Sequence, residues 1–303
     1  MAAGPTTAAR GPSGAERPGL GAVRPLPITM GSRTLDFSRT HVMGILNVTP
    51  DSFFDGGRYD DGTRAEARAL LLEEAGADVI DVGGESTRPG SKPVDESEEM
   101  ARVLPVIGAI RKRSDVPISI DTTKSAVARA ALDAGADAVN DISGLRFDPG
   151  IADLAAERSA PLVLMHSRAV PEIMQQDVRY GDLLDEILRE LEASVDLAVS
   201  RGVARETIII DPGIGFGKTA RHNLEILASP GFMAPLGLPV LVGPSNKSFI
   251  GAVTDAPVEE RTGGTAAAVS AAVLAGVHMI RVHDVATMRQ VAAIAEAIRK
   301  TGV

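Results

Sequence analysis

The sequence contains no cysteine. This absence excludes disulfide bonds, thiolate nucleophiles, iron–sulfur clusters and cysteine-based zinc sites. Tryptophan is absent as well, and the aromatic residues are seven phenylalanines and two tyrosines. Because the formal net charge is also −9, a nucleic-acid partner is not expected, since proteins that bind nucleic acid need a basic face and often aromatic stacking platforms.

Long hydrophobic runs are missing too. No apolar run approaches the roughly 20 residues that a membrane-spanning helix needs, and no charged segment followed by an apolar one opens the chain as in a signal peptide. We therefore expect a soluble, cytoplasmic protein without a membrane partner. Hydrophobic residues make up 44% of the 303 residues, which is enough to form a large core.

The first 27 residues differ in composition from the rest of the chain. They are mainly Ala, Gly, Pro and Arg, with few large apolar side chains. Such a segment cannot bury enough surface to offset the entropy lost on ordering, so a disordered tail is predicted for residues 1–27. A mitochondrial transit peptide is the alternative because acidic residues are scarce there, but the amphipathic apolar face of a transit helix is missing. Residues 28–303 are predicted to form a single domain.

Short β-branched segments with polar or glycine-rich ends alternate with longer helical segments along this domain. Eight strand segments can be counted, at residues 41–49, 78–86, 117–123, 138–144, 161–167, 207–213, 239–245 and 278–284. The stretches "EAGAD", "DAGAD" and "LAGVH" each place a glycine just before a strand. A glycine is favoured there because a helix often ends on a residue with positive φ.

Eight βα units over residues 39–303 match the size of an α/β fold of the (β/α)8 TIM-barrel type. The competing fold is a doubly wound open sheet, whose first strand leads into a glycine-rich turn that binds pyrophosphate. Here the first strand leads into "NVTPDSFFDGG", a long polar loop, so the TIM barrel is predicted. Residues 28–40 carry a Gly-Ser in their middle and are predicted to form a short hairpin that closes the bottom of the barrel.

The eight strand ends are expected to form one ring, because TIM barrels carry their chemistry at the C-terminal ends of the strands. A single strand-end acid is more often a turn or helix cap than a catalyst. Asp121, Asn140 and Asp211 are harder to explain in that way, since all three end hydrophobic strands and buried polar groups need partners. The other residues of the ring are Asn47, Glu85, Ser86, Asp141, Met165, His166, Ser245, Arg281, His283 and Asp284.

The chemistry of this ring suggests a ligand. Two carboxylates and an amide suit a molecule with several N–H donors and a carbonyl acceptor, such as the 2-amino and lactam edge of a fused heterocycle. The cationic side chains of Arg88, Lys247, Arg281 and His283 lie nearby in the same loops, and in a chain of net charge −9 they suggest an anionic group such as phosphate. For Arg281 the alternative is an ion pair with Asp284 or a neighbouring strand end.

The stretch "IIIDPGIGFGK" at residues 208–218 places three glycines in alternation after a strand. A dinucleotide-binding turn needs a different spacing, with the third glycine one position later, and lies in the first βαβ unit of its domain. A dinucleotide site is therefore not predicted, and Asp211 at the strand end requires another explanation.

Eight segments together resemble those of dihydropteroate synthases, in the same order: "MGILNVTPDSFFDGG", "DVGGESTRPGS", "SIDTTK", "VNDISG", "LMHS", "DPGIGFGK", "SNKSFIG" and "RVHD". The resemblance runs from Pro27 to the C-terminus. It implies a TIM-barrel enzyme, typically a homodimer that depends on Mg²⁺. Such enzymes condense 6-hydroxymethyl-7,8-dihydropterin pyrophosphate with p-aminobenzoate and release dihydropteroate and pyrophosphate.

The resemblance also implies roles for individual residues. The pterin would be bound by Asp121, Asn140, Ile142, Met165, Asp211 and Lys247. Pyrophosphate would be bound by Asn47, Arg88, Arg281 and His283, with Asn47 also the Mg²⁺ ligand. The p-aminobenzoate side would be formed by Thr87, Pro89, Gly215, Phe216, Lys247 and Ser248. The catalytic residues implied are Asp121 and Lys247, together with Asp51 and Asp55 of the first loop.

These roles agree with the chemistry of the reaction. Breaking the C–O bond to pyrophosphate leaves a pterin-methyl cation, which a pre-placed carboxylate such as Asp121 would stabilise in the transition state. Mg²⁺, Arg281 and His283 would stabilise the leaving pyrophosphate. The N-terminus of a helix that begins near Ser248 would attract the carboxylate of p-aminobenzoate.

One position departs from the family pattern, and two alternative functions stay open. The family usually has Ser-Arg-Lys where this chain has Asn246 between Ser245 and Lys247. A pterin-binding methyltransferase barrel would share the Asp–Asn–Asp ring but lack "NVTPDSF", "GESTRP" and "RVHD". A non-catalytic pterin carrier would need no residues for Mg²⁺ or pyrophosphate. Because the loops carry no insertion, sensitivity to sulfonamides is expected.

Overall fold

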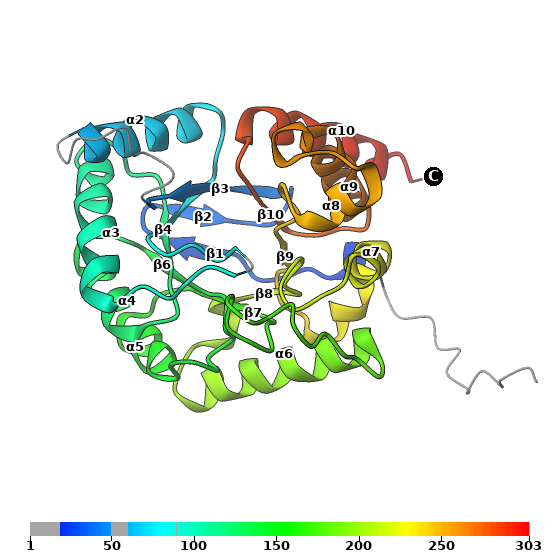
Figure 1. The fold of residues 1–303 in the computed structure, drawn as a ribbon, viewed down its shortest axis with the longest axis horizontal. Helices are drawn as coiled ribbons and strands as arrows, with labels where there is room; N and C mark the ends of the chain where they lie inside the picture. The colour runs from blue at the N-terminus through cyan, green and yellow to red at the C-terminus, as the bar shows by residue number, and fades with distance from the viewer. Residues whose placement is uncertain (1–18, 50–59, 89, 303) are drawn as a thin grey trace, which may run out of the picture.

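The computed structural model describes residues 19–49, 60–88 and 90–302. Its centre is a sheet of eight parallel strands, and Figure 1 shows the helices arranged around this sheet. In sheet order the strands are β8 (Ile208–Asp211), β7 (Leu162–Met165), β6 (Ala138–Asp141), β5 (Ile118–Asp121), β4 (Val79–Gly83), β3 (His41–Asn47), β10 (Met279–Val282) and β9 (Leu241–Val242). A parallel bridge between Ile210 and Val240 links the two outermost strands and closes the barrel. The predicted TIM barrel is confirmed.

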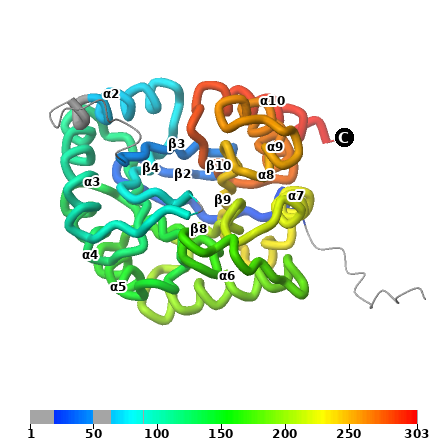
Figure 2. The backbone as a smooth tube through the Cα atoms, in the orientation of Figure 1, coloured from blue at the N-terminus to red at the C-terminus, as the bar shows by residue number. Residues whose placement is uncertain are grey.

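The first and last strands of the barrel lie side by side, as the backbone trace in Figure 2 shows for β3 and β10. Each strand is followed by one or more helices that cover the outside of the barrel. These helices are α2 (Asp60–Glu74), α3 (Glu96–Arg111), α4 (Ser125–Asp133), α5 (Gly150–Arg158), α6 (Leu183–Ser200), α7 (Ala220–Ala228), α8 (Ser248–Thr254), α9 (Thr262–Leu274) and α10 (Val285–Lys300). No helix in the described part of the chain is long and apolar enough to cross a membrane.

A two-stranded hairpin packs against the N-terminal end of the barrel. Strands β1 (Ile28–Met30) and β2 (Arg33–Leu35) pair antiparallel. Ile28, Met30 and Leu35 are buried in a cluster with the first inward-facing residues of the barrel strands: Met43, Val79, Ala138, Val163, Ile209, Leu241 and Met279. The hairpin therefore fills the bottom of the barrel as predicted, and the opposite end is left for the site.

The glycines of the repeated pattern lie where the sequence predicts. Gly76, Gly135 and Gly276 follow α2, α4 and α9, and their φ angles are +97°, +113° and +95°. An L-residue with a side chain rarely adopts such angles. Each glycine thus lets the chain leave a helix and enter the next strand within a short turn.

Two boundaries differ from the prediction. Residues 20–22, which the sequence analysis assigns to the tail, form a 3-10 helix, η1 (Leu20–Ala22), and Leu20 is fully buried against the barrel core. Ordered structure therefore begins before residue 28, because a single large apolar side chain anchors this segment; residues 1–18 lie outside the described residues. The strands are also shorter than predicted, since their polar ends belong to the loops that form the site.

Candidate active site

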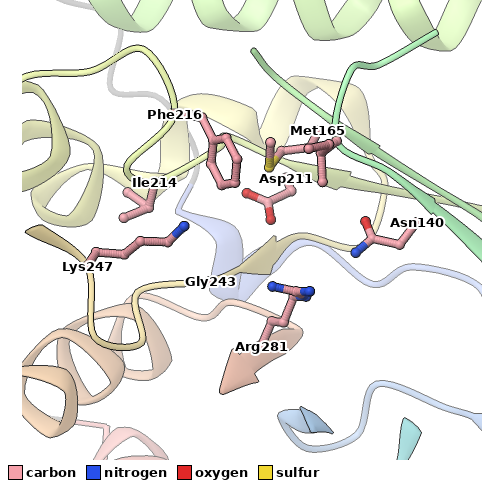
Figure 3. Close-up of a pocket in the computed structure, with 9 residues that line it drawn as sticks. Asn140, Met165, Asp211, Ile214, Phe216, Gly243, Lys247 and Arg281 are labelled. Carbon is pink, nitrogen blue, oxygen red and sulfur yellow. The ribbon is translucent and has the colours of Figure 1, made fainter. Parts of the chain in front are cut away.

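The polar strand ends converge on a cavity at the mouth of the barrel. Asp121 and Asp211 are the last residues of β5 and β8, and Asn140 is next to last in β6. In Figure 3 the side chains of Asn140, Asp211, Lys247 and Arg281 point toward a common space. This cavity is lined by Asn140, Ile142, Met165, Asp211, Ile214, Phe216, Gly243, Lys247 and Arg281.

Arg281 lines this cavity and joins two carboxylates that are buried behind its surface. Its Nε donates to Asp81 at 2.6 Å, and its Nη2 donates to Asp121 at 2.7 Å. The side-chain nitrogen of Asn140 also donates to Asp81, at 3.0 Å. This hydrogen bond orients the amide group of Asn140, which lines the cavity. These groups form a preassembled set of two carboxylates, one guanidinium and one amide.

Burial changes the protonation of both predicted pterin-binding acids. Burial raises the pKa of Asp121 to about 7, against the opposing effect of Arg281. Burial likewise raises the pKa of Asp211 to about 6, although the backbone N–H of Gly213 donates to its carboxylate at 2.7 Å. Carboxylates that ionise this close to neutrality are typical of functional sites.

Lys247 lies on the opposite wall from Asn140. Its Nζ lies 4.1 Å above the ring of Phe216, close enough for a cation–π contact. Burial lowers the pKa of Lys247 to about 8. The apolar part of the cavity is a separate cluster formed by Ile142, Met165, Met174 and Phe216. A flat ring with a polar edge could therefore contact the polar and the apolar side chains of this cavity at the same time.

The rim carries most of the remaining predicted residues. Asn47 ends β3 and is partly buried, and its side chain makes no hydrogen bond with the described residues. The Nδ1 of His283 and the hydroxyl of Ser245 share a hydrogen bond of 2.9 Å. Thr87 is partly buried and Arg88 is exposed. Asp51, Asp55 and Pro89 lie outside the described residues.

The alternative predicted for Arg281, an ion pair with Asp284 or a strand end, holds in part, because Arg281 pairs with Asp121 at the end of β5 and with Asp81. Asp284 does not pair with Arg281, because its carboxylate caps α10 by accepting from the backbone N–H of Thr287 at 3.1 Å. Asp141, another residue of the predicted ring, is also a structural acid. It accepts from the backbone N–H groups of Ser143 and Leu145, at 2.8 and 2.6 Å. The capping role that the sequence analysis weighed for strand-end acids holds for these two.

Sequence analysis missed Asp81. Its side chain is fully buried in β4, and one of its oxygens has no hydrogen-bond partner among the described residues. The alternation of the strand contained a signal, since Val79 faces the interior of the barrel and residues two apart share a face. An acid at that inward position of a continuous hydrophobic strand predicts a site residue.

Asn246 has a structural reason to stand where the family usually has arginine. Its φ is +57°, and Asn adopts this left-handed conformation more readily than most residues. Its backbone N–H donates to the hydroxyl of Thr265 at 3.1 Å, and its carbonyl accepts from Arg261 at 3.1 Å. The loop that carries Lys247 is thereby fixed without the arginine.

Comparisons with known proteins agree with this site. The family described as "Pterin binding enzyme" matches residues 43–283, so the chain is one of the pterin-binding barrels. The dihydropteroate synthase of Synechocystis is 49% identical, with 90% of this chain and 96% of the relative covered. That of Bacillus subtilis is 48% identical, with 87% and 90% covered.

Solved structures give the same result. A Yersinia pestis dihydropteroate synthase in complex with a sulfonamide drug has a TM-score of 0.85 and 42% identity, covering 91% of this chain and all of that chain. A Xanthomonas albilineans dihydropteroate synthase in complex with 7,8-dihydropteroate has a TM-score of 0.82 and 39% identity, covering 90% and 98%. This chain belongs to the dihydropteroate synthase family.

Proposed function

We propose that this protein joins a dihydropterin methyl group to the amino group of p-aminobenzoate, with pyrophosphate as the leaving group. The observation that carries the proposal is the set of Asp81, Asp121 and Arg281, which are hydrogen-bonded at the end of a barrel. Membership of the dihydropteroate synthase family supports the same reaction. The alternatives of a methyltransferase and of a pterin carrier are tested by the experiment below.

The pterin ring would lie between the polar and the apolar side chains of the cavity. Asp211 would accept hydrogen bonds from the amino and ring N–H groups, while Lys247 and Asn140 would serve the carbonyl and ring nitrogen atoms. Met165 and Ile142 would pack on the faces of the ring, since both belong to the apolar cluster of the cavity. Each polar edge of a pterin then has a complementary partner.

Asp121 would stabilise the cation that forms when the C–O bond to pyrophosphate breaks. Its carboxylate is buried and already held by Arg281 at 2.7 Å, so it need not reorganise as positive charge develops. The arylamine nitrogen then attacks the methylene carbon and loses a proton. No strong base is required, because the amine is a nucleophile without prior deprotonation.

Pyrophosphate would bind on the rim, near Asn47, Arg88 and His283, with the charge of Arg281 beneath it. Among the described residues no three His, Asp or Glu side chains gather to hold a metal. Asn47 offers a single neutral oxygen, which fits Mg²⁺, an ion that keeps several waters and binds through substrate phosphates. When bound, Mg²⁺ would neutralise charge on the leaving group. The catalytic roles of Asp51 and Asp55, which the family resemblance implies, are part of this proposal.

The p-aminobenzoate would lie against Gly215, Phe216 and Lys247, with Ser248 and the second-loop residues Thr87 and Pro89 beside it. The N-terminus of α8, which begins at Ser248, would attract its carboxylate. A sulfonamide has a similar shape and charge, and the Yersinia pestis relative was solved with such a drug. We therefore propose that sulfonamides compete with p-aminobenzoate for this protein.

We also propose that the protein is a homodimer. Large apolar side chains are exposed on α7, α8, α9, α10 and the 3-10 helix η4 (Val258–Glu260), elements that lie on one side of the barrel in Figure 1. They are Leu224, Val253, Val258, Leu274, Ile294 and Ile298. Sedimentation of the purified protein would give twice the chain mass of 31.5 kDa, whereas a monomer at every concentration would contradict the proposal.

The test is pyrophosphate release from dihydropterin pyrophosphate and Mg²⁺, measured with and without p-aminobenzoate. Release that requires p-aminobenzoate is expected. Pterin binding without release would indicate a carrier, and methyl transfer from a reduced folate to a corrinoid protein would indicate a methyltransferase. Equal affinity for the pterin alcohol and its pyrophosphate would also favour the carrier.

A further inference from the structure

A buried lysine lies under the glycine turn that follows β8. Lys218 is only 3% exposed. Its Nζ lies 2.9 Å from the carbonyl oxygen of Phe216, 3.3 Å from the carbonyl oxygen of His166 and 3.0 Å from His166 Nδ1. An ammonium group has three N–H donors and no acceptor. All three donors of Lys218 are therefore used inside the protein, and the side chain is not free to contact a substrate.

His166 extends this contact to the outer helices. It is buried, and its Nε2 lies 3.1 Å from the carboxylate of Glu190 on α6. Because Nδ1 accepts from Lys218, Nε2 must carry the proton and donate to Glu190. Burial lowers the pKa of His166 to about 4, so the ring is neutral and can accept. Arg168 donates to the same carboxylate at 3.0 Å and so holds Glu190 in place beside His166.

The turn held by Lys218 is packed without spare room. A Cβ on Gly213 would lie 2.1 Å from the carbonyl oxygen of His166, and one on Gly215 would lie 2.8 Å from the side chain of Lys247. Side chains also hold the carbonyls on both sides of Phe216. Gln175 donates to the carbonyl of Gly215 at 3.0 Å, and Tyr180 donates to that of Gly217 at 3.1 Å. Three side chains thus hold the carbonyls of residues 215–217, and of these three only Lys218 also forms a hydrogen bond at the end of β7.

The position of Phe216 affects the site directly. Its ring lines the cavity and lies 4.1 Å beneath the ammonium of Lys247, as the labelled side chains in Figure 3 illustrate. A shift of the Phe216 backbone would move the ring and leave Lys247 without its support. Met165, which precedes His166, lines the same cavity and belongs to the same apolar cluster as Phe216. Lys218 therefore connects the two backbone segments that carry these side chains.

We propose that Lys218 is a positioning residue for the p-aminobenzoate subsite: through the carbonyls of Phe216 and His166 it sets the place of the Phe216 ring and of Lys247. This inference rests on the proposed function. It also accounts for the burial of a charged side chain, which a methionine of similar length would fill with less loss of hydration.

The experiment compares the full-length wild type with Lys218→Met and Lys218→Gln. The first removes every donor, and the second keeps an amide with two. We expect Lys218→Met to raise the KM for p-aminobenzoate about tenfold or more, as a small misplacement of a binding group can. The KM for dihydropterin pyrophosphate should rise less than that for p-aminobenzoate, because Lys247, which also serves the pterin, loses only the contact with Phe216. Lys218→Gln should fall between the two proteins.

Two further variants make the comparison specific. Lys112→Met removes an exposed lysine at the C-terminal end of α3 and should leave both KM values unchanged. Tyr180→Phe removes a neighbouring tether of the turn while leaving β7 connected, so it should raise the KM for p-aminobenzoate less than Lys218→Met does. Circular dichroism and thermal melting establish that each variant is folded.

Each possible outcome of these measurements either supports or overturns the positioning role of Lys218. Equal increases in both KM values, or unchanged values in folded Lys218→Met, would overturn the proposal. If Lys218→Met does not fold, Lys218→Gln takes its place, and if neither folds, Lys218 is a structural residue and the proposal is wrong. Absence of p-aminobenzoate-dependent turnover in the wild type would instead refute the proposed function, and the two failures are thereby distinguished.

Discussion

At the scale of the residue, the central feature is a guanidinium that holds two buried carboxylates. Arg281 is within 2.7 Å of both Asp81 and Asp121, and its single positive charge cannot fully compensate two buried negative charges. The cavity therefore favours a ligand that brings further positive charge or N–H donors. A pterin that becomes cationic during the reaction meets that need.

The first prediction concerns Asp121. Replacing Asp121 with Asn or Ala should lower kcat by about 10²-fold or more, because one preorganised charge is lost from the transition state. Folding should survive, since Arg281 keeps its bond to Asp81 at 2.6 Å. Steady-state turnover and a thermal melt check the two parts. A folded Asp121→Ala variant with a near-wild-type rate would remove the cation-stabilising role.

The second prediction is the pH dependence of kcat/KM. Burial raises the pKa of Asp121 to about 7, so activity should rise with pH through that value as the carboxylate ionises. Burial lowers the pKa of Lys247 to about 8 and that of Lys218 to about 7, so activity should fall again as these ammonium groups lose their protons. We therefore expect a narrow bell-shaped pH profile of kcat/KM, with its maximum between about pH 7 and about pH 8. A flat profile from about pH 6 to about pH 9 would contradict it.

At the scale of the element, the turn after β8 shows how backbone conformation serves the site. Gly213, Gly215 and Gly217 have φ angles of +70°, +84° and +57°. These conformations let the chain fold back over His166 and place Phe216 in the cavity wall. The glycines that resemble a dinucleotide motif in the sequence are explained by this close packing.

The third prediction tests that packing with two matched substitutions. Gly213→Ala adds a Cβ that would lie 2.1 Å from a backbone oxygen, whereas Gly237→Ala, at a similar φ of +67°, meets no atom within 4 Å. Both variants should be destabilised by about 1 to 2 kcal/mol, because alanine is strained in the left-handed conformation. The Gly213→Ala protein should be destabilised further and should lose most of its activity. Equal melting temperatures and equal activities for the two variants would show that the turn has room to adjust.

The elements also explain how much of the site could be predicted. Asp121, Asn140 and Asp211 could be found because they lie at or next to the ends of hydrophobic strands. The structure places Asn140 and Asp211 in the cavity lining and links Asp121 to it through Arg281. Asp81 could not be found from strand ends, because it lies two residues inside β4 and only the inward register identifies it. Lys218 is harder still, since its role depends on His166, a residue 52 positions away that only the closed barrel brings near.

At the scale of the whole molecule, the barrel separates stability from chemistry. The hairpin and the first inward-facing residues of the strands form one apolar cluster at the bottom. The cavity and its apolar lining form another group at the mouth. In TIM barrels this division lets the mouth carry strained turns and buried charges while the bottom supplies stability.

The fourth prediction follows from this division. Met30 of the hairpin is fully buried, and Met30→Ala should lower the free energy of unfolding by about 2 to 5 kcal/mol. The KM values for both substrates should not change, because the cavity is at the other end of the barrel. Chemical denaturation and steady-state kinetics measure the two effects. A large change in either KM with unchanged stability would show that the two ends are coupled.

The whole account depends on one reaction, and its most direct measurement is the stoichiometry of the two products. Purified protein would be given dihydropterin pyrophosphate, Mg²⁺ and p-aminobenzoate, with dihydropteroate measured by mass spectrometry and pyrophosphate by a coupled assay. We predict one dihydropteroate for each pyrophosphate, and neither product without p-aminobenzoate. Pyrophosphate released without dihydropteroate, or bound pterin with no product at all, would contradict the account.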